Sequence, residues 1–324
     1  MMRVFVTKGG CLSAIEAAQG AVPAETLWVD LSNPTPEELK PVEAAYKIVA
    51  PTREEMQEIE ASSRLYREDG AVFMTATIVS GADTEAPESH AVAFILAEGR
   101  LITVRHSEPR AFITFPQRAV RQPGLWSSAE RVLLGLLDAI VDRTADVLER
   151  VSVDVDMLSR EIFGARARKA PLDSGDFHEL LVRLGRENDL TGRIRESLVS
   201  VNRLVTFLTQ VTDTTSGKEF RANVKTLSRD IASLSDHTHY LSNKMTFLLD
   251  ATLGLISTEQ NKVIKILAVA GTVFLPPTLF ASIWGMNFHH MPELDEAWGY
   301  PLAIAVILAS GLVPFFYFRW RKWF

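Results

Sequence analysis

Residues 263–287 read Val263-Ile-Lys-Ile-Leu-Ala-Val-Ala-Gly-Thr-Val-Phe-Leu-Pro-Pro-Thr-Leu-Phe-Ala-Ser-Ile-Trp-Gly-Met-Asn287. Between Ile266 and Ile283 this stretch carries no charged side chain. At about 1.5 Å rise per residue that part forms roughly 27 Å of helix, close to the thickness of a bilayer's hydrocarbon core. A second uncharged run follows, from Pro301 to Phe318. Two such runs separated by a hairpin are rarely core helices, so we predict transmembrane helices at about 263–283 and 300–318.

Charged residues around the two runs predict their orientation. Lys262 and Lys265 precede the first run and three basic residues lie in the tail 319–324, whereas the loop 284–299 has neither Lys nor Arg. The positive-inside rule therefore predicts that both termini are cytoplasmic and that the loop lies outside. The loop also holds three acidic residues that would concentrate cations at an outer mouth, Glu293, Asp295 and Glu296.

The rest of the chain has the composition of a soluble, acidic protein. The last 64 residues carry five Lys or Arg and three Asp or Glu, which leaves the first 260 with 29 basic and 37 acidic residues. The excess of acidic over basic residues argues against a nucleic-acid partner. Cys11 is the single cysteine, which excludes an intrachain disulfide and a zinc site of clustered thiolates. The N-terminus has no apolar stretch of signal-peptide length, so we expect the first 260 residues to stay in the cytoplasm.

Residues 1–125 are predicted to form a mixed α/β, sandwich-like domain. Short β-rich runs separated by turn residues predict five strands, at 3–7, 26–31, 71–80, 90–96 and 101–105. Thr35-Pro-Glu-Glu38 and Pro51-Thr-Arg-Glu-Glu55 are typical of helix N-termini. The domain has no glycine-rich phosphate loop, nucleophile elbow or catalytic His/Asp/Ser spacing, so we expect that the protein is not an enzyme. The order of the strands does not follow from the sequence.

Residues 126–260 are predicted to form long helices. Helical periodicity begins near Ser127, a turn is expected at 164–175, and a second helix is expected at 177–208. A third helix, from about 219 to 282, would be roughly 95 Å long and would continue into the first membrane run. Its heptad seam consists of Phe220, Val224, Leu227, Ile231, Leu234, Thr238, Leu241, Met245, Leu248, Thr252 and Leu255. The predicted fold is thus an α+β cytosolic domain with long helices, followed by a two-helix transmembrane domain at 261–324.

A second stripe runs along another face of the third helix. It is mostly small or polar and includes Asn261, Gly271, Leu275, Thr278, Ser282 and Gly285. Two helices cannot enclose a water-filled path, so a pore would need several copies of the chain around a symmetry axis. The stripe has two interpretations that the residues alone leave open, namely the lining of a narrow channel and a surface for close helix packing.

Several segments resemble the CorA family of magnesium and cobalt transporters, in its proteobacterial form. Gly285-Met286-Asn287 directly follows a membrane helix and precedes Met291-Pro-Glu-Leu294, as in the family signature. The segments Phe274-Leu-Pro-Pro-Thr278, Trp298-Gly-Tyr-Pro301 and the basic aromatic C-terminus are similar too, and looser similarity reaches Asp30-Leu-Ser-Asn-Pro34. The resemblance therefore covers nearly the whole chain.

The resemblance implies a homopentameric funnel in the inner membrane, which carries Mg²⁺, and also Co²⁺ or Ni²⁺, inward along the membrane potential. It implies that the first span lines the pore and that Asn287 of the Gly285-Met286-Asn287 filter selects ions. Pore positions that match the family are Asn261, Leu267, Leu275, Thr278, Ser282 and Gly285. His289-His290 departs from the family pattern and could favour softer ions such as Ni²⁺, Co²⁺ or Zn²⁺.

Family members close when intracellular Mg²⁺ occupies acidic sites between subunits. Candidates here are Asp230, Asp236 and Asp250, although each also fits an ordinary solvated helix face. Two alternatives to Mg²⁺ transport remain. One is a zinc transporter of the ZntB branch, which usually has another residue in place of Met286, and the other is a membrane-anchored helical scaffold or sensor that conducts nothing.

Overall fold

The computed structural model describes residues 1–8, 10–15, 22–84, 86–164, 174–212, 217–287, 291–292, 296–321 and 323. The chain divides into two compact units, Met1–Leu248 and Leu249–Phe324. The long helix α7 (Lys218–Trp284) contributes to both units. The predicted fold class is confirmed, because an α/β domain and long helices precede two candidate membrane helices. The predicted division at residues 125 and 260 stays a prediction.

A seven-stranded sheet forms the centre of the first unit. Its strands are β1 (Met2–Lys8), β2 (Cys11–Ile15), β3 (Thr26–Ser32), β4 (Leu65–Glu68), β5 (Ala71–Ser80), β6 (Glu88–Ala97) and β7 (Arg100–Arg105). The order is β2-β1-β3-β7-β6-β5-β4, and β3 pairs with β7 in parallel while the other pairs are antiparallel. All five predicted strands are present, and β2 and β4 were not predicted.

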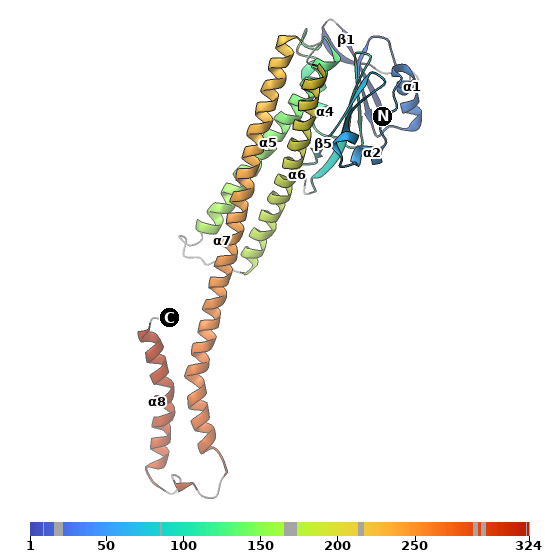
Figure 1. The fold of residues 1–324 in the computed structure, drawn as a ribbon. Helices are drawn as coiled ribbons and strands as arrows, with labels where there is room; N and C mark the ends of the chain where they lie inside the picture. Colours follow the sequence, from blue (N-terminus) through green and yellow to red (C-terminus); the bar gives the residue numbers. More distant parts are fainter. Residues whose placement is uncertain are drawn as a thin grey trace. The chain divides into compact units, whose positions relative to one another are not determined.

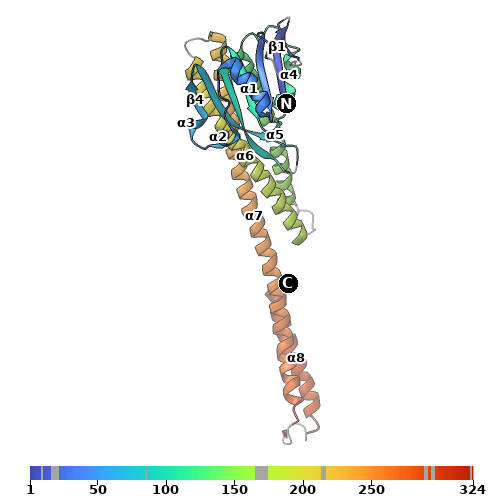
Figure 2. The ribbon, with the colours of Figure 1, turned by 90° about the vertical axis from the view of Figure 1, so that its right-hand side faces the viewer.

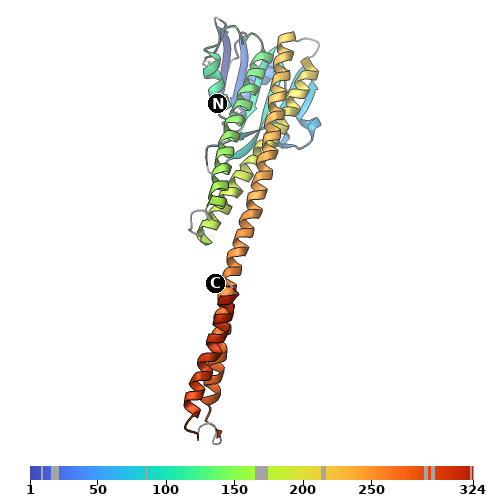
Figure 3. The ribbon, with the colours of Figure 1, turned by 90° about the vertical axis from the view of Figure 1, so that its left-hand side faces the viewer.

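Helices cover both faces of this sheet (Figure 1, Figure 2). On one face lie α1 (Pro36–Tyr46) and α2 (Arg53–Gln57), next to the short α3 (Ala61–Arg64). On the other lie α4 (Ala111–Ala119), α5 (Ala129–Gly164) and α6 (Ser174–Thr212), which Figure 3 shows in front of the sheet. Every residue of the inner strand β3 is buried, as in strands with both faces covered.

The predicted helix starts at Thr35 and at 51–55 are confirmed as capping boxes. The Thr35 N–H donates to Glu38 Oε2 (3.1 Å) at the start of α1. At the start of α2, the Thr52 N–H donates to Glu55 Oε2 (2.8 Å), and the Glu55 N–H donates to Thr52 Oγ1 (3.2 Å). Each box provides partners for N–H groups that a helix start leaves free.

A buried ion pair joins the two parallel strands. Arg105 on β7 donates from Nε and Nη2 to the two oxygens of Asp30 on β3, at 3.0 Å each, and both side chains are 1% exposed. Thr103 Oγ1 also donates to Asp30 (2.9 Å), and Arg3 Nη2 adds a further bond (2.8 Å). The carboxylate is thus fully hydrogen-bonded, which a buried charge requires.

The predicted heptad seam of α7 is the buried face of that helix. Most of its residues are buried and the remaining two, Leu234 and Leu255, are half-buried. Helix α5 runs beside α7, since Arg131 bonds Glu219 (2.8 Å), Asp156 pairs with Lys244, and the rings of Phe163 and Phe247 stack at 6.0 Å. The seam therefore packs within one chain. The turn predicted at 164–175 lies largely outside the described residues.

The second unit is a helical hairpin of α7 and α8 (Gly299–Trp320). The Lys265 ammonium lies 5.7 Å from the Trp323 ring centre, so the start of the first apolar run is beside the chain's C-terminal tail. Near the middle, a Cβ added at Gly311 would lie 3.1 Å from Cγ of Pro277 and 3.4 Å from the carbonyl oxygen of Val273. The two helices therefore run antiparallel in close contact.

Gly135 tests the packing of the first unit. A Cβ at this position of α5 would lie 2.3 Å from Cζ3 of Trp126 and 2.8 Å from Cε2 of Phe115. We expect Gly135→Ala to lower the free energy of unfolding by about 1–3 kcal/mol, because the rings must move. The matched change Gly185→Ala on α6, where an added Cβ meets nothing within 4 Å, should raise stability by about 0.5–1 kcal/mol through helix propensity.

Thermal unfolding of the purified full chain, followed by circular dichroism, measures both changes. Equal melting temperatures for Gly135→Ala and the wild type would contradict the packing described around Trp126.

Candidate functional site

The motif Gly285-Met286-Asn287 lies immediately after the last residue of α7, Trp284. The Gly285 N–H donates to the carbonyl of Ala281 (3.0 Å), and the Met286 N–H donates to that of Ile283 (3.3 Å), so the helix tightens as it ends. All three residues are exposed, Met286 by 48%. Within the described part of the chain, the Asn287 carboxamide has no hydrogen-bond partner and is available to a ligand or another copy.

The predicted pore-lining residues share one side of α7. Asn261, Leu267, Leu275, Thr278 and Ser282 are exposed, and Gly271 is half-buried. The leucines are notable, because Leu267 is 66% and Leu275 69% exposed. A single chain leaves this stripe without a covering layer.

The stripe points away from α8. One residue turns a helix by about 100°, which puts Val269, Val273 and Pro277 on one side and Gly271, Leu275, Thr278 and Ser282 on the opposite side. Val269 is 4% exposed, and Val273 and Pro277 adjoin Gly311 of α8. One face of α7 therefore packs on α8, while the stripe remains open for other contacts.

Two features add acceptor oxygens to this part of α7. The Thr278 hydroxyl donates to the carbonyl of Phe274 (2.7 Å). Pro276 and Pro277 have no N–H, so the carbonyls of Thr272 and Val273 lack the usual helical donor four residues on. Membrane helices tolerate such prolines where neighbours or water provide replacement donors.

The acidic residues predicted at an outer mouth are described only in part. Glu296 is exposed, and its carbonyl accepts the Gly299 N–H (3.0 Å) at the start of α8. Glu293 and Asp295, as well as His289 and His290, lie outside the described residues.

The three candidate regulatory aspartates are exposed on α7 but do not form one cluster. Asp230 and Asp250 are 20 residues apart, roughly 30 Å along a helix. Asp230 differs from the others because its charge acts on an acidic residue of α5, Asp138. Burial raises the pKa of Asp138, and the charges of Asp142 and Asp230 raise that pKa further, while Arg118 lowers it.

Among the described residues, no three His, Cys, Asp or Glu side chains are grouped so that they could hold a metal ion. A separate group of charged side chains lies around Asp83 in the first unit. Asp83 receives the guanidinium groups of Arg110, Arg143 and Arg150 beside a cavity of about 530 Å³. The sequence carries no signal for this group, because its members come from separate elements without a characteristic spacing.

The C-terminal hairpin identifies the class of protein. Two described helices, α7 and α8, are long and apolar enough to cross a membrane. Only 6% of the most apolar window of α7, and none of that of α8, is buried inside the chain, unlike a soluble core helix. With its large N-terminal α/β domain, the chain has the architecture of a membrane protein with two C-terminal spans.

The chain belongs to the CorA family. A family profile described as CorA-like Mg²⁺ transporter protein matches residues 23–321. The magnesium transport protein CorA of Yersinia pseudotuberculosis serotype I (strain IP32953) is 35% identical over 324 residues, which is all of both chains. The resemblance found in the sequence is thereby confirmed, and this curated relative is a transport protein.

Solved structures share the fold. The complete CorA magnesium transporter from Methanocaldococcus jannaschii superposes with a TM-score of 0.76 at 16% identity, covering 100% of this chain and 99% of that one. The ZntB cytoplasmic domain from Vibrio parahaemolyticus RIMD 2210633 gives a TM-score of 0.58 at 10% identity, covering 79% of this chain and 98% of that domain. The N-terminal fold is therefore common to both branches and does not distinguish their ions.

Two glycines provide a test of the packing of the hairpin, one at the contact between α7 and α8 and one on the side of α7 that points away from α8. Gly311 adjoins Pro277, whereas a Cβ added at Gly271 meets nothing within 4 Å in the chain. We expect Gly311→Leu to destabilise the hairpin by about 1–3 kcal/mol through overpacking. Gly271→Leu should leave the stability of a single chain nearly unchanged. Thermal unfolding in detergent, followed by tryptophan fluorescence, measures both, and equal effects would contradict the assignment of the two faces.

Proposed function

We propose that this protein transports Mg²⁺ into the bacterial cytoplasm as a homopentamer in the inner membrane. The observation that carries the proposal is the exposed Asn287 of an intact Gly285-Met286-Asn287 motif at the end of a candidate membrane helix, in a chain of the CorA family. The full-length similarity to a curated magnesium transport protein supports Mg²⁺ as the substrate.

The path is formed by α7 from each copy. Two helices of one chain cannot surround water, and the stripe from Asn261 to Ser282 is left open by α8. Cyclic symmetry brings the same stripe from every copy to one axis. Exposed leucines such as Leu267 and Leu275 then form apolar rings, which can close a narrow path by excluding water.

Selection occurs at Asn287. Mg²⁺ holds its water tightly and usually keeps several waters when it binds to proteins. A ring of neutral carboxamide oxygens can accept hydrogen bonds from that hydration shell without replacing it. Glu296, with Glu293 and Asp295 of the same loop, would raise the local concentration of cations before they reach the ring.

The membrane potential drives the uptake. A divalent ion that crosses the membrane gains roughly 4.6 kcal/mol per 100 mV, twice the value for a single charge. The basic residues at both ends of the hairpin favour cytoplasmic termini, and the contact between Lys265 and Trp323 supports a common level for those ends. No chemical reaction is required, in agreement with the expectation that the protein is not an enzyme.

Co²⁺ and Ni²⁺ are proposed as further substrates because they have the charge and a hydration similar to that of Mg²⁺. Zn²⁺ transport of the ZntB type is the second candidate, and the shared N-terminal fold favours it only at the level of architecture. Met286 argues for the magnesium branch. A non-conducting scaffold would have no need for the open, partly polar stripe of α7.

Asn287→Ala tests the selectivity ring. We expect it to abolish Mg²⁺-dependent growth of a transport-deficient host, because the ring of carboxamide oxygens is lost while the helix end is retained. Asn202→Ala, which removes an exposed carboxamide from α6, is the matched control and should support normal growth. Growth with Asn287→Ala at wild-type membrane levels would remove Asn287 from the proposed role.

Uptake assays with the same proteins, reconstituted in liposomes, distinguish the candidate substrates. Uptake of Mg²⁺ and Co²⁺ driven by potential alone supports the proposal, whereas Zn²⁺ uptake that requires a proton gradient supports the ZntB-type alternative.

Gly271→Leu should reduce uptake without lowering thermal stability, because its side chain narrows the path.

We propose that intracellular Mg²⁺ regulates transport through exposed aspartates of α7, with Asp230 the strongest candidate. Its negative charge acts on Asp138 of α5, whose pKa is raised by burial first and then by the charges of Asp142 and Asp230. A divalent cation bound there would relieve this repulsion. Asp236 and Asp250 are exposed on the same helix, where they are available to bind a divalent cation together with carboxylates of another copy.

Neutralising these aspartates tests the regulation. We expect the triple variant Asp230→Asn, Asp236→Asn, Asp250→Asn to keep its currents when internal Mg²⁺ is raised, and Asp230→Asn alone to shift inhibition to higher Mg²⁺. Glu149→Gln, which neutralises an exposed acid on α5, should retain wild-type inhibition. Patch-clamp recording from liposomes measures the response. Unchanged inhibition in the triple variant would exclude all three residues as sensors.

A further inference from the structure

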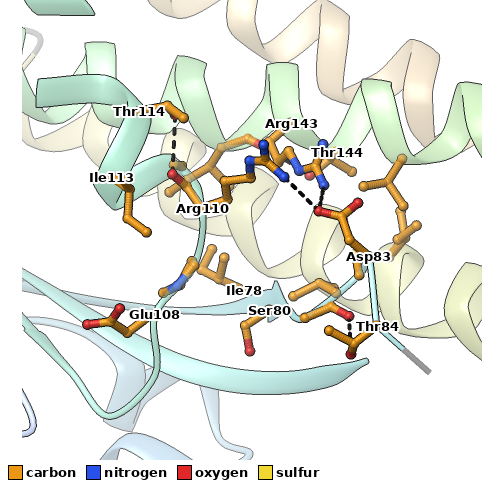
Figure 4. Close-up of a pocket in the computed structure, with 18 of the residues that line it drawn as sticks. Ile78, Ser80, Asp83, Thr84, Glu108, Arg110, Ile113, Thr114, Arg143 and Thr144 are labelled. Atoms are coloured by element: carbon orange, nitrogen blue, oxygen red, sulfur yellow. Dashed lines mark hydrogen bonds and ion pairs between the residues drawn. The ribbon is translucent and has the colours of Figure 1, made fainter. Parts of the chain in front are cut away.

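A cavity of about 530 Å³ lies where the sheet meets α4, α5 and α6 in the first unit. Its apolar wall includes Ile78 of β5, Ile140 and Val147 of α5, and Ile194 of α6. Its polar side includes Asp83, Arg110 and Arg143, which converge as Figure 4 shows. An apolar pocket of this size with a few convergent polar groups is typical of a site for a small molecule.

The polar side is a carboxylate surrounded by arginines. Arg110 Nη1 and Arg143 Nη2 both donate to Oδ2 of Asp83, at 2.9 and 2.5 Å, and Arg150 Nη1 donates to Oδ1. Arg150 also binds the carbonyl of Ala82 (3.1 Å). The hydrogen bonds from Arg150 and Arg143 lower the pKa of Asp83 to about 2, so this carboxylate stays ionised at neutral pH.

These four side chains carry a net charge of +2. Glu108 also lines the cavity, but it lies 3.8 Å from Arg105 and belongs to the balanced group of Arg3, Asp30 and Arg105. On the far side, Arg143 Nη1 is 3.9 Å from Asp146, whose side chain is 68% exposed and therefore well screened by water. Glu187 of α6 interacts with Arg150 and offsets one further positive charge. A surplus of one positive charge therefore remains at the cavity.

The arginines have donors to spare. A guanidinium has five N–H groups, and the hydrogen bonds described for Arg110 and Arg143 use one from each. Two guanidinium groups that share one carboxylate oxygen are arranged to hold a group with more oxygens and more charge. A phosphate monoester, with three oxygens and a charge of about −1.5 to −2 at pH 7, fits both requirements.

Two threonines indicate the remainder of the ligand. The hydroxyl of Thr114 donates to the carbonyl of Arg110 (3.2 Å), and that of Thr144 donates to the carbonyl of Ile140 (2.8 Å). Both line the cavity, and their oxygens are left as acceptors for hydroxyl or amine donors. An organic phosphate with such donors on an uncharged body, such as a sugar phosphate or nucleotide, is the chemical class that matches.

We propose that this cavity binds a soluble organic phosphate, whose phosphate contacts Arg110 and Arg143 and takes the place of Asp83, and whose uncharged body lies over Ile78 and Ile140. Asp83 is then an internal competitor for the site. The proposal concerns the first unit alone and does not depend on the transported ion.

Isothermal titration of the detergent-purified full chain with AMP tests the proposal. AMP should bind to the wild type, and adenosine, which has no phosphate, should bind at least tenfold more weakly. Asp83→Asn removes the competitor and should strengthen AMP binding about tenfold, whereas Arg143→Gln should weaken it by tenfold or more. Arg118→Gln, which removes an arginine paired with Asp138 and Asp142 outside this cavity, should leave AMP binding unchanged.

Arg143→Lys keeps the charge but loses the planar fork, so it should fold normally and still weaken AMP binding. Weaker binding in Asp83→Asn, or equal binding in Arg143→Gln, Arg143→Lys and the wild type, would overturn the assignment. Dihexanoylphosphatidic acid provides the comparison with a lipid headgroup. Binding of this lipid without binding of AMP would likewise overturn the proposal of a soluble ligand.

Discussion

Apolar surface that the chain itself cannot bury determines the arrangement of the second unit. Almost none of the apolar window of α7, and none of that of α8, is buried within the chain. The stripe of α7 opposite α8 is open as well, with leucines two-thirds exposed. Lipid can cover the outside of such a hairpin, and in the proposed assembly other copies cover the stripe, so that selection and assembly are proposed on the same helix.

Much of the fold could be predicted because long periodic patterns report which side is buried. The seam from Phe220 to Leu255 predicted the buried face of α7, and the capping residues Thr35 and Thr52 predicted two helix starts. The strands β2 and β4 were missed, because edge strands of five and four residues leave too little alternation to recognise. Strand order was beyond reach since the residues that pair between β3 and β7 are 73 positions apart in the sequence, for example Trp28 with Leu101.

The candidate site, too, could be predicted only in part. Residues on one helix or just after it, such as Gly271, Thr278 and Asn287, could be named from spacing and from the family resemblance, although their roles remain proposals. Only the packed hairpin shows that this stripe faces away from Gly311 of α8. The group around Asp83 could not be found at all, since a loop after β5 and the helices α4 and α5 come together only in the folded domain. Electrostatic groups assembled from distant segments leave no local pattern.

The internal hydrogen bond of Thr278 has a consequence for the sign of the ion. Since its hydrogen is given to the carbonyl of Phe274, the hydroxyl oxygen can only accept on the side away from the helix axis. Water around a cation turns its hydrogens outward, and a ring of such oxygens in the proposed path matches that orientation. A bare anion would find no donor there. Charge discrimination can thus arise in an uncharged segment of membrane helix, from the direction of one proton per chain.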